Sequence, residues 1–265
     1  MKTNYHTHTS RCHHARGEDR DYVEAAIRGG YQVLGFADHG PFPFKNGYVS
    51  KGTRMTVGEL DGYLASIRSL KQEYAGQIEI LTGLEYEAFP AYMDWLADMA
   101  EEKQLDYMIL GNHFELDEEN ALKFAFTETP AQMRSYLDQT IRGMESGLFA
   151  YLCHPELYMY NYRVWDDEAK AVSRAICQAA KQYDMPLEYN LYGVYKIAKG
   201  VCPGPGYPYP LFWEMAAREG CRVILGMDAH DPFRLESKDH EIALRFLNSL
   251  GIEITDTIPL RGQKA

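Results

Sequence analysis

The stretch QVLGFADH, residues 32–39, decides the fold class of this chain. It is a short apolar run that ends on an acid and a histidine, which is typical of a parallel strand buried on both faces. The segment before it, residues 18–28, has apolar side chains at helical spacing and ends at Gly29-Gly30, where a helix commonly stops. A helix that leads into a buried strand is the repeating unit of an α/β fold with parallel strands.

The same unit recurs along the whole chain. Further strands are predicted at residues 2–6, 78–85, 107–114, 150–154, 186–190 and 222–228, with a small closing strand at 252–255. Further helices are predicted at residues 56–74, 92–102, 129–144, 166–183, 211–219 and 240–250. Seven such units without a break in composition predict one α/β domain over residues 1–265. A closed barrel and an open doubly wound sheet both fit this alternation, but no G-x-G-x-x-G follows the first strand to support a dinucleotide-binding fold.

Composition and charge narrow the class of partner. The 265 residues carry a net charge of −11, which repels nucleic acid and anionic membranes. No apolar run reaches the length of a membrane span, and the N-terminus is polar without a signal core. The five cysteines show no CxxC spacing, so reduced thiols are expected. We therefore expect a cytoplasmic protein that binds neither long nucleic acid nor a membrane, and the oligomeric state stays open.

The histidines follow the predicted strands. Eight of the nine lie at the C-terminal end of a strand or in the loop after it, namely His6, His8, His13, His14, His39, His113, His154 and His230. In parallel α/β folds these strand ends converge on one face, where active sites lie. Imidazoles that gather on one rim predict a metal site with more than one ion.

Acidic residues occupy the same strand ends. They are Asp38, Glu85, Glu87 and Asp228. Imidazole and carboxylate together suit Zn, Fe or Mn, and one carboxylate can bridge two ions. Glu87 competes with Glu85 for this role because both face the same way if the strand continues. Only one of the adjacent His13 and His14 is expected to bind metal.

Two of these groups repeat one geometry. His6-x-His8 and Asp228-x-His230 each place two ligand-type side chains on the same face of a strand. If the sheet closes into a barrel, the first and seventh predicted strands are neighbours. The two pairs are then expected to meet.

Taken together, these residues resemble the PHP family, the polymerase and histidinol phosphatase phosphoesterases. The resembling blocks are His6-Thr7-His8, His14, Ala37-Asp38-His39-Gly40, Gly83-Leu84-Glu85, Gly111-Asn112-His113, Cys153-His154-Pro155 and Gly226-Met227-Asp228-Ala229-His230. The resemblance implies a distorted (β/α)7, TIM-like barrel with three divalent metal ions, Zn, Fe or Mn, at the C-terminal rim of the strands. It also implies hydrolysis of a small phosphate ester. Members of this length favour L-histidinol phosphate, the substrate of a phosphatase in histidine biosynthesis.

The resemblance implies roles residue by residue. The first metal would be held by His6, His8, Glu85 and Asp228, the second by His113 and His154 with Glu85 as the bridge, and the third by His14, His39 and His230. A hydroxide bridging the first two metals would attack phosphorus, so Glu85, Asp228 and His230 are expected to act in catalysis. The leaving group would take its proton from a metal-bound water or from the Asp228–His230 region. Asp38 is expected to orient the imidazole of His39.

Several loop residues are candidates for binding the substrate. Those that could clamp phosphate are Arg16, Arg163, Lys196 and Lys199, and those that could meet an amine or imidazole are Glu115, Glu156, Tyr158 and Tyr192. The loop of residues 40–55 has the length and composition of a functional loop. The Pro/Gly/Tyr-rich run of residues 200–210 is predicted to lie over the site.

Three other functions share features with this sequence. A PHP phosphodiesterase or nuclease acting on a small nucleotide is compatible with the acidic charge, whereas a long nucleic acid is disfavoured. An amidohydrolase also opens with His-x-His, but that resemblance would need a mid-barrel lysine ligand and a lone late aspartate. A regulatory domain that has lost catalysis is disfavoured because the ligand set is complete. The phosphoesterase is therefore the expectation.

Overall fold

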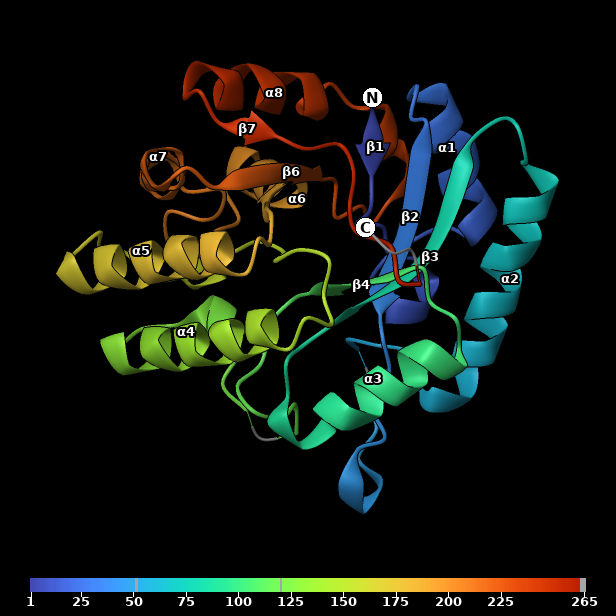
Figure 1. The fold of residues 1–265 in the computed structure, drawn as a ribbon, viewed down its shortest axis with the longest axis horizontal. Helices are drawn as coiled ribbons and strands as arrows, with labels where there is room; N and C mark the ends of the chain where they lie inside the picture. The colour runs from blue at the N-terminus through green and yellow to red at the C-terminus, as the bar shows by residue number, and fades with distance from the viewer. Residues whose placement is uncertain (51, 120, 263–265) are drawn as a thin grey trace.

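The computed structural model describes the chain except for residues 51, 120 and 263–265. Its strands pair in parallel (Figure 1). One sheet has the order β1 (Thr3–Asn4), β2 (Val33–His39), β3 (Glu79–Tyr86) and β4 (Tyr107–Leu110). The other has the order β5 (Leu187–Asn190), β6 (Arg222–Gly226) and β7 (Glu253–Ile254). Strand order therefore follows the chain within each sheet, as consecutive βα units require.

Isolated backbone bridges link the two sheets. Leu152 pairs in parallel with Leu110, the last residue of β4, and with Leu187, the first residue of β5. Beyond the ends of β1 and β6, Thr7 pairs in parallel with Ala229. The backbone N–H of Ala229 donates to the carbonyl of His6 at 3.2 Å. The sheet is therefore curled, and the chain beyond β1 lies beside the chain beyond β6, the neighbour relation expected for the first and seventh predicted strands.

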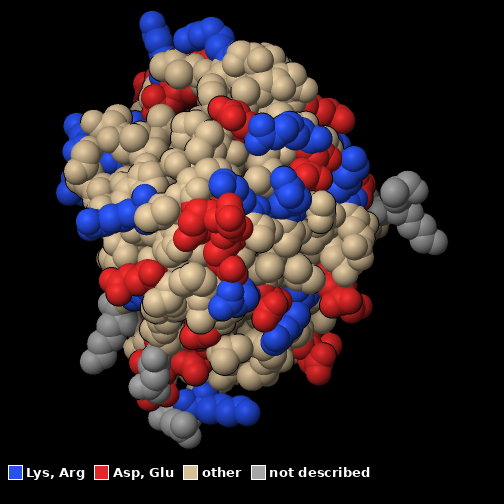
Figure 2. Space-filling view, turned by 90° about the vertical axis from the view of Figure 1, so that its left-hand side faces the viewer, with Lys and Arg blue, Asp and Glu red and all other residues tan. Residues whose placement is uncertain are grey.

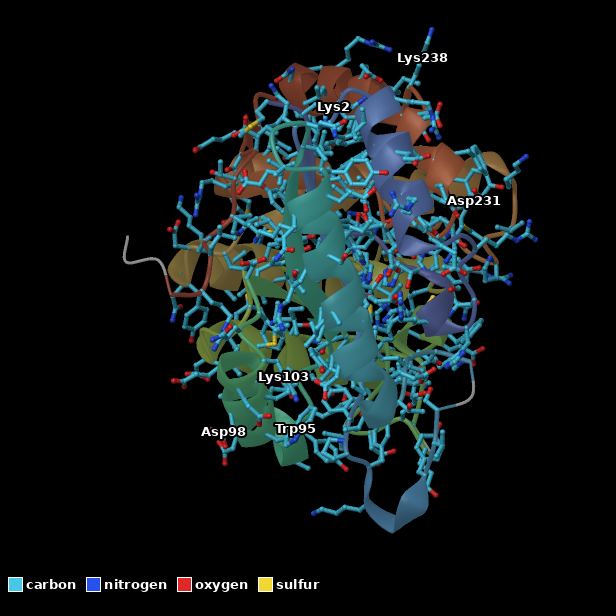
Figure 3. All side chains as sticks on the ribbon, turned by 90° about the vertical axis from the view of Figure 1, so that its right-hand side faces the viewer. Lys2, Trp95, Asp98, Lys103, Asp231 and Lys238 are labelled. Carbon is cyan, nitrogen blue, oxygen red and sulfur yellow. The ribbon has the colours of Figure 1, made fainter. Side chains whose placement is uncertain are left out.

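Helices lie around the curled sheet (Figure 1). They are α1 (Asp19–Arg28), α2 (Leu60–Glu73), α3 (Met93–Glu102), α4 (Pro130–Glu145), α5 (Asp167–Gln182), α6 (Leu191–Ala198), α7 (Pro210–Glu219) and α8 (Asp239–Ser249). In Figure 3, α2 runs in front of the sheet, and Lys103 at the end of α3 forms an ion pair with Asp61 of α2 at 2.9 Å. Basic and acidic side chains are interspersed over the face shown in Figure 2. Within the described part of the chain, no helix combines the length and the apolar character that crossing a membrane requires.

Alternate residues of the central strands enter two different apolar clusters. In β2, Leu34 and Phe36 belong to the large cluster that includes helix side chains, whereas Val33 and Ala37 belong to a small cluster made mostly of strand residues. Because side chains alternate along a strand, His39 lies on the same face as Val33 and Ala37. Glu85 of β3 follows Leu81 of the small cluster in the same way. Both site residues therefore point to the inner face of the curled sheet.

The predicted parallel α/β architecture is confirmed, and several boundaries are corrected. Residues 150–154, predicted as a full strand, form an isolated bridge at Leu152, although the backbone N–H groups of Ala150 and Cys153 still donate to the carbonyls of Met108 and Leu110 at 2.8 Å. The predicted strands at 2–6, 107–114 and 222–228 stop early, at Asn4, Leu110 and Gly226. The loop expected after β5 is the helix α6, which starts at once because the side chain of Asn190 accepts from the N–H of Gly193 at 2.9 Å and caps it.

Candidate metal centre and substrate pocket

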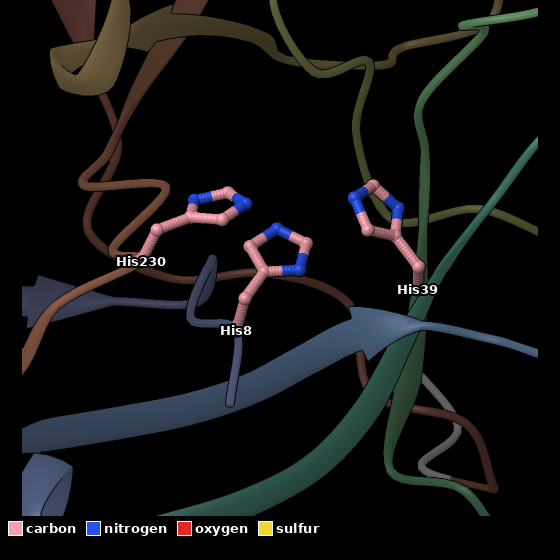
Figure 4. A group of neighbouring side chains, drawn as sticks. All are labelled: His8, His39 and His230. Carbon is pink, nitrogen blue, oxygen red and sulfur yellow. The ribbon is translucent and has the colours of Figure 1, made fainter. Parts of the chain in front are cut away.

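The candidate site lies where the parallel strands end. The ladder between β2 and β3 sets His39 directly beside Glu85. His8, from the segment after β1, stands between His39 and His230 in Figure 4, with ring centroids 4.4 Å and 4.2 Å from theirs. Three segments that are far apart in sequence thus bring imidazoles into contact. The structure brings together His6, His8, His14, His39, Glu85, His113, His154, Asp228 and His230.

Glu85 faces histidines with both of its oxygens. Oε2 lies 3.0 Å from His39 Nδ1 and 3.5 Å from Nε2 of both His6 and His8. Oε1 lies 3.2 Å from His154 Nε2 and 3.5 Å from His113 Nε2. A carboxylate with two histidine groups on its two oxygens has the arrangement of a ligand shared between two ions.

Asp228 completes the group around the first histidine pair. Its Oδ1 lies 3.2 Å from His8 Nε2, 3.5 Å from His6 Nε2 and 3.2 Å from His230 Nδ1. The backbone of Asp228 has φ 46°, and that of His154 has φ 30°. Such left-handed conformations are uncommon for residues other than glycine and cluster at functional sites. Here they aim a carboxylate and an imidazole at the same centre.

Outer acceptors fix the proton positions of four imidazoles. Two Nδ1 atoms face carboxylates: that of His6 lies 2.6 Å from Glu188 Oε1, and that of His113 lies 3.1 Å from Glu87 Oε1. The other two face backbone carbonyls: that of His14 lies 2.7 Å from the carbonyl of Cys12, and that of His230 lies 3.0 Å from the carbonyl of Asp228. Carboxylates and carbonyls accept here, so each Nδ1 carries a proton and each Nε2 faces the cluster; burial lowers the pKa values of His14 and His230, which leaves lone pairs on their Nε2 atoms. Nε2 of His14 and Nε2 of His230 are 3.0 Å apart. Two lone pairs at this distance repel unless a cation lies between them.

Many buried polar atoms in the cluster have no hydrogen-bond partner. Among the described residues they are His6 Nε2, both ring nitrogens of His8, His39 Nδ1, His154 Nδ1, Glu85 Oε2 and Asp228 Oδ1. Unpaired buried polar groups are costly, and most buried polar atoms in proteins are satisfied. Divalent cations would satisfy several of these atoms together, and imidazole with carboxylate is a donor set for Zn, Fe or Mn. The residues present therefore fit divalent metal ions.

The charges in the cluster favour a cation. Although burial opposes ionisation, the surrounding histidines hold the pKa values of Glu85 and Asp228 well below the usual range. Burial also opposes a charge on His8, but the nearby carboxylates of Asp228 and Asp38 raise the pKa of His8 to about 9, so a metal ion would take the place of a proton on this ring. Burial lowers the pKa of His39 well below 6.5, which leaves this imidazole neutral. Ionised carboxylates and neutral imidazoles are the forms that bind metal.

A cavity of about 300 Å³ opens directly over the cluster. The Lys196 side chain, from α6, lines it and lies 4.4 Å from the ring centroid of Tyr192, with the rings of Tyr160 and Tyr207 at 5.5 Å and 5.9 Å. Burial lowers the pKa of Lys196. Lys123 lines the cavity from a different loop. The cavity thus combines metal-type donors, aromatic walls and two ammonium groups.

Residues 4–191 match the family model of the PHP domain. The chain belongs to the PHP family. A "Probable histidinol-phosphatase" of Deinococcus radiodurans is 28% identical over 268 residues, covering 98% of this chain and 96% of that protein. A histidinol-phosphatase of Bacillus subtilis is 33% identical over 119 residues, 43% of this chain and 44% of that protein. The chain is therefore a PHP protein similar to histidinol phosphatases.

A solved structure shares the fold of this PHP chain. It is the histidinol phosphate phosphatase of Lactococcus lactis in complex with zinc, L-histidinol and phosphate. The TM-score is 0.72 with 18% identity, and the match covers 97% of both chains. Asp228 and His230 lie beyond the residues matched by the family model. Their place in the cluster rests on their contacts in this structure, with His8 for Asp228 and with His14 for His230.

The substrate candidates in this PHP chain fall into two groups. Lys196 and Tyr192 line the cavity, and the Tyr192 ring stacks on His230 with centroids 4.8 Å apart. The others are absent from its described lining. Arg16, Arg163 and Lys199 are exposed, Glu115 accepts from the hydroxyl of Ser135, and Tyr158 is buried against Ser173. Glu156 is buried instead against Trp213, whose Nε1 donates to Oε1 at 2.6 Å.

The expectation that Asp38 orients His39 is wrong. Its Oδ1 accepts from the backbone N–H of His39 at 3.1 Å and lies 3.5 Å from the ring Nδ1 of His8, and its Oδ2 accepts from Thr9. Successive side chains on β2 point to opposite faces, so Asp38 turns away from the His39 ring. The contacts also distinguish Glu85 from Glu87, and His14 from His13. Glu85, and not Glu87, lies at the centre of the cluster. His14 faces His230 with its Nε2, whereas His13, although adjacent in sequence, has no place among the ring contacts of the cluster in the described residues.

Sequence reasoning missed three residues beside the site. Glu188 is fully buried and holds His6, Arg54 is buried beside Glu87, and Lys123 lines the cavity. The one available signal for Glu188 was a lone carboxylate inside the apolar strand PLEYN, because such a buried charge needs a partner. Thiols of Cys12 and Cys153 also come within reach of ligand atoms, and neither carries a spacing signal.

Proposed function

We propose that this chain is a metal-dependent phosphomonoesterase that hydrolyses L-histidinol phosphate to L-histidinol and phosphate. The observation that carries the proposal is the convergence of inward-facing lone pairs and two ionised carboxylates beneath a cavity lined by Lys196. The names of the relatives support the choice of substrate. We further propose that residues 1–265 form one domain whose bridges at Thr7–Ala229 and Leu152 complete a seven-stranded barrel.

The site would hold up to three divalent ions. His6, His8, Glu85 and Asp228 would hold the first, Glu85 with His113 and His154 the second, and His14, His39 and His230 the third. When bound, such ions activate water as a nucleophile and offset the charge of the phosphoryl group. The small cavity favours a compact phosphate ester over a polymer.

The chain's own residues would position the substrate and carry protons. The Lys196 ammonium would bind the phosphate oxygens, since it lines the cavity and lies over the Tyr192 ring, whose face attracts a cation. Asp228 is ionised and the Nδ1 proton of His230 is held by the Asp228 carbonyl at 3.0 Å, so water in the cavity would supply the proton for the leaving alkoxide. Glu188 would hold the proton on His6 Nδ1, leaving Nε2 free toward the metal. The walls of Tyr160, Tyr192 and Tyr207 would receive the imidazole of the leaving group.

The test is metal analysis combined with a panel of phosphate esters. We expect at least two tightly bound ions per chain and turnover of histidinol phosphate after loading with Zn, Mn or Fe. Fewer than two ions, or no hydrolysis of any phosphate ester, would contradict the proposal. Chelation should abolish turnover, and re-addition of metal should restore it.

A second candidate is hydrolysis of a small nucleotide. The described lining favours a nucleotide in one respect, because the tyrosine faces can stack on a base and two lysines also line the cavity. The carboxylates in the described lining, Glu85 and Asp228, both belong to the metal cluster, so neither is free to bind an ammonium group of the substrate. An ammonium-bearing leaving group thus finds aromatic faces rather than a separate acid. Rapid turnover of a nucleotide with none of histidinol phosphate would favour this candidate.

A further inference from the structure

A buried arginine joins two loops that border the cavity. Arg54 lies between β2 and α2 and is 1% exposed. Its Nε donates to Glu118 Oε2 at 2.5 Å and its Nη1 to the carbonyl of Gly40 at 2.9 Å. Its Nη2 donates to both oxygens of Glu87, at 2.8 Å and 2.9 Å. A buried charge cluster of this kind persists only when each member is well bonded, and removing one member leaves an uncompensated charge.

Arg54 reaches His113 through Glu87. The same Oε1 of Glu87 that accepts from Arg54 also accepts from Nδ1 of His113 at 3.1 Å. This hydrogen bond keeps the proton on Nδ1, so the lone pair of Nε2 faces Glu85 Oε1 at 3.5 Å. By orienting the carboxylate of Glu87 and offsetting its charge, Arg54 controls how the imidazole is presented.

The second arm of Arg54 holds the cavity wall together. Gly52 and Thr53, which directly precede it, line the cavity. Phe114, Lys123 and Phe126, on either side of Glu118 in sequence, line it as well. The Ser50 hydroxyl also donates to Glu118. The Arg54–Glu118 contact therefore ties the loop after β2 to the loop after β4.

We propose that Arg54 is a positioning residue with two separable arms. The Glu87 arm presents His113 to the metal, and the Glu118 arm keeps the two loops closed around the substrate. The proposal rests on the proposed function, because it assumes that His113 binds metal and that the cavity binds a phosphate ester. It assigns this chain a determinant of metal retention that lies outside the ligand set.

The metal arm is tested by Zn²⁺ competition with a chelating indicator, in the absence of substrate. We expect Arg54→Met to weaken the weakest zinc site by about 10- to 100-fold, the range seen when residues behind metal ligands are changed. Arg54→Lys keeps the charge and should recover part of this loss. In a His113→Ala background, Arg54→Met should cause no further loss, because the two residues act as one unit. Arg20→Met, which removes an exposed guanidinium paired with Glu73, is the matched control and should keep wild-type affinity.

The substrate arm is tested with Glu118→Gln in the zinc-loaded enzyme. This variant should raise KM while zinc affinity and kcat stay close to those of the wild type. Wild-type zinc affinity in Arg54→Met, or an equal further loss in the His113→Ala background, would overturn the proposal. If Arg54→Met does not fold, a zinc loss in Glu118→Gln as large as that in Arg54→Lys would overturn the separation of the arms. Since zinc is measured without substrate, a chain that binds zinc but hydrolyses no phosphate ester contradicts the proposed function alone.

Discussion

Gly111 leaves the space that the carboxylate of Glu85 occupies. A Cβ at this position would lie 1.9 Å from Glu85 Oε1, whereas ordinary contacts begin at 3.4 Å. In Gly111→Ala the carboxylate must therefore retreat by about 1.5 Å, the difference between these two distances. Cδ and Cγ of Glu85 would also lie too close, at 2.6 Å and 2.8 Å, so the whole side chain must turn away; because no backbone atom is among the three nearest atoms, we expect the fold to survive.

The displacement removes the contacts that would define the second metal site. Oε1 is the oxygen that lies 3.2 Å from His154 Nε2 and 3.5 Å from His113 Nε2. A misplacement of about 1 Å at a catalytic group costs roughly 100-fold in rate, so kcat/KM should fall by at least about this factor. We also expect loss of one equivalent of bound metal, although no proposed ligand is replaced.

The matched control is Gly62→Ala in α2, where no atom lies within 4 Å of the added methyl group. It should keep full activity and raise the free energy of unfolding by up to about 1 kcal/mol, because alanine favours a helix interior over glycine. Metal content, kcat/KM and urea unfolding are measured on both variants. Wild-type metal content and turnover in Gly111→Ala would refute the assignment of Glu85 as the shared ligand.

Three further outcomes are expected. His14→Ala should lose most of the activity and part of the metal, because the His14 ring lies against those of His39 and His230. His13→Ala should be much milder, and a larger loss of activity in His13→Ala than in His14→Ala would refute the ligand choice. Burial raises the pKa of Glu156 to about 8, so this carboxyl stabilises the fold most below pH 4.5, and that contribution is lost as the pH rises to about 8. Glu156→Gln can still accept from Trp213, so its free energy of unfolding should rise relative to that of the wild type between pH 4.5 and about 8, as measured by denaturant titration. If the free energies of unfolding of the two proteins change in parallel with pH, Glu156 is not buried in its neutral form. Lys196→Met should raise KM for the phosphate ester while bound metal is unchanged, and an unaltered KM would exclude Lys196 as the phosphate partner.

The sequence was sufficient for features that depend on strand periodicity. Short apolar runs that end on His39 and Glu85 predicted parallel strands, and parallel strands bring their ends to one rim. It was insufficient where a role depends on a partner from elsewhere in the chain. Glu188 holds His6 from 182 residues away, and Arg54 is buried because Glu87 and Glu118 meet it from other segments. A single charged residue in a strand or loop does not indicate such a partner.

The geometry at the strand ends also explains two predictions that the structure corrects, the partner of Asp38 and the strand at residues 150–154. Asp38 and His39 are adjacent in sequence, yet they face opposite sides of β2, so sequence proximity misassigned the acid to the wrong imidazole. Residues 150–154 have the composition of a strand and make backbone hydrogen bonds to β4 and β5, and the left-handed backbone at His154 ends the extended segment where its imidazole meets the cluster.

The division between strands and loops has a consequence for specificity. The carboxylates and most imidazoles of the cluster stand at or just beyond strand ends, and their outer partners Glu188, Glu87 and Asp38 are buried. Lys123 and Lys196, in contrast, reach the cavity from a loop and from α6. The backbone that carries the cluster is tied into the sheet, whereas the outer cavity wall is built largely from connecting segments, which tolerate sequence change more readily. The reaction chemistry is therefore set by the sheet, and the identity of the leaving group is set by the segments after β2, β4 and β5, which is where substitutions that alter substrate choice should concentrate.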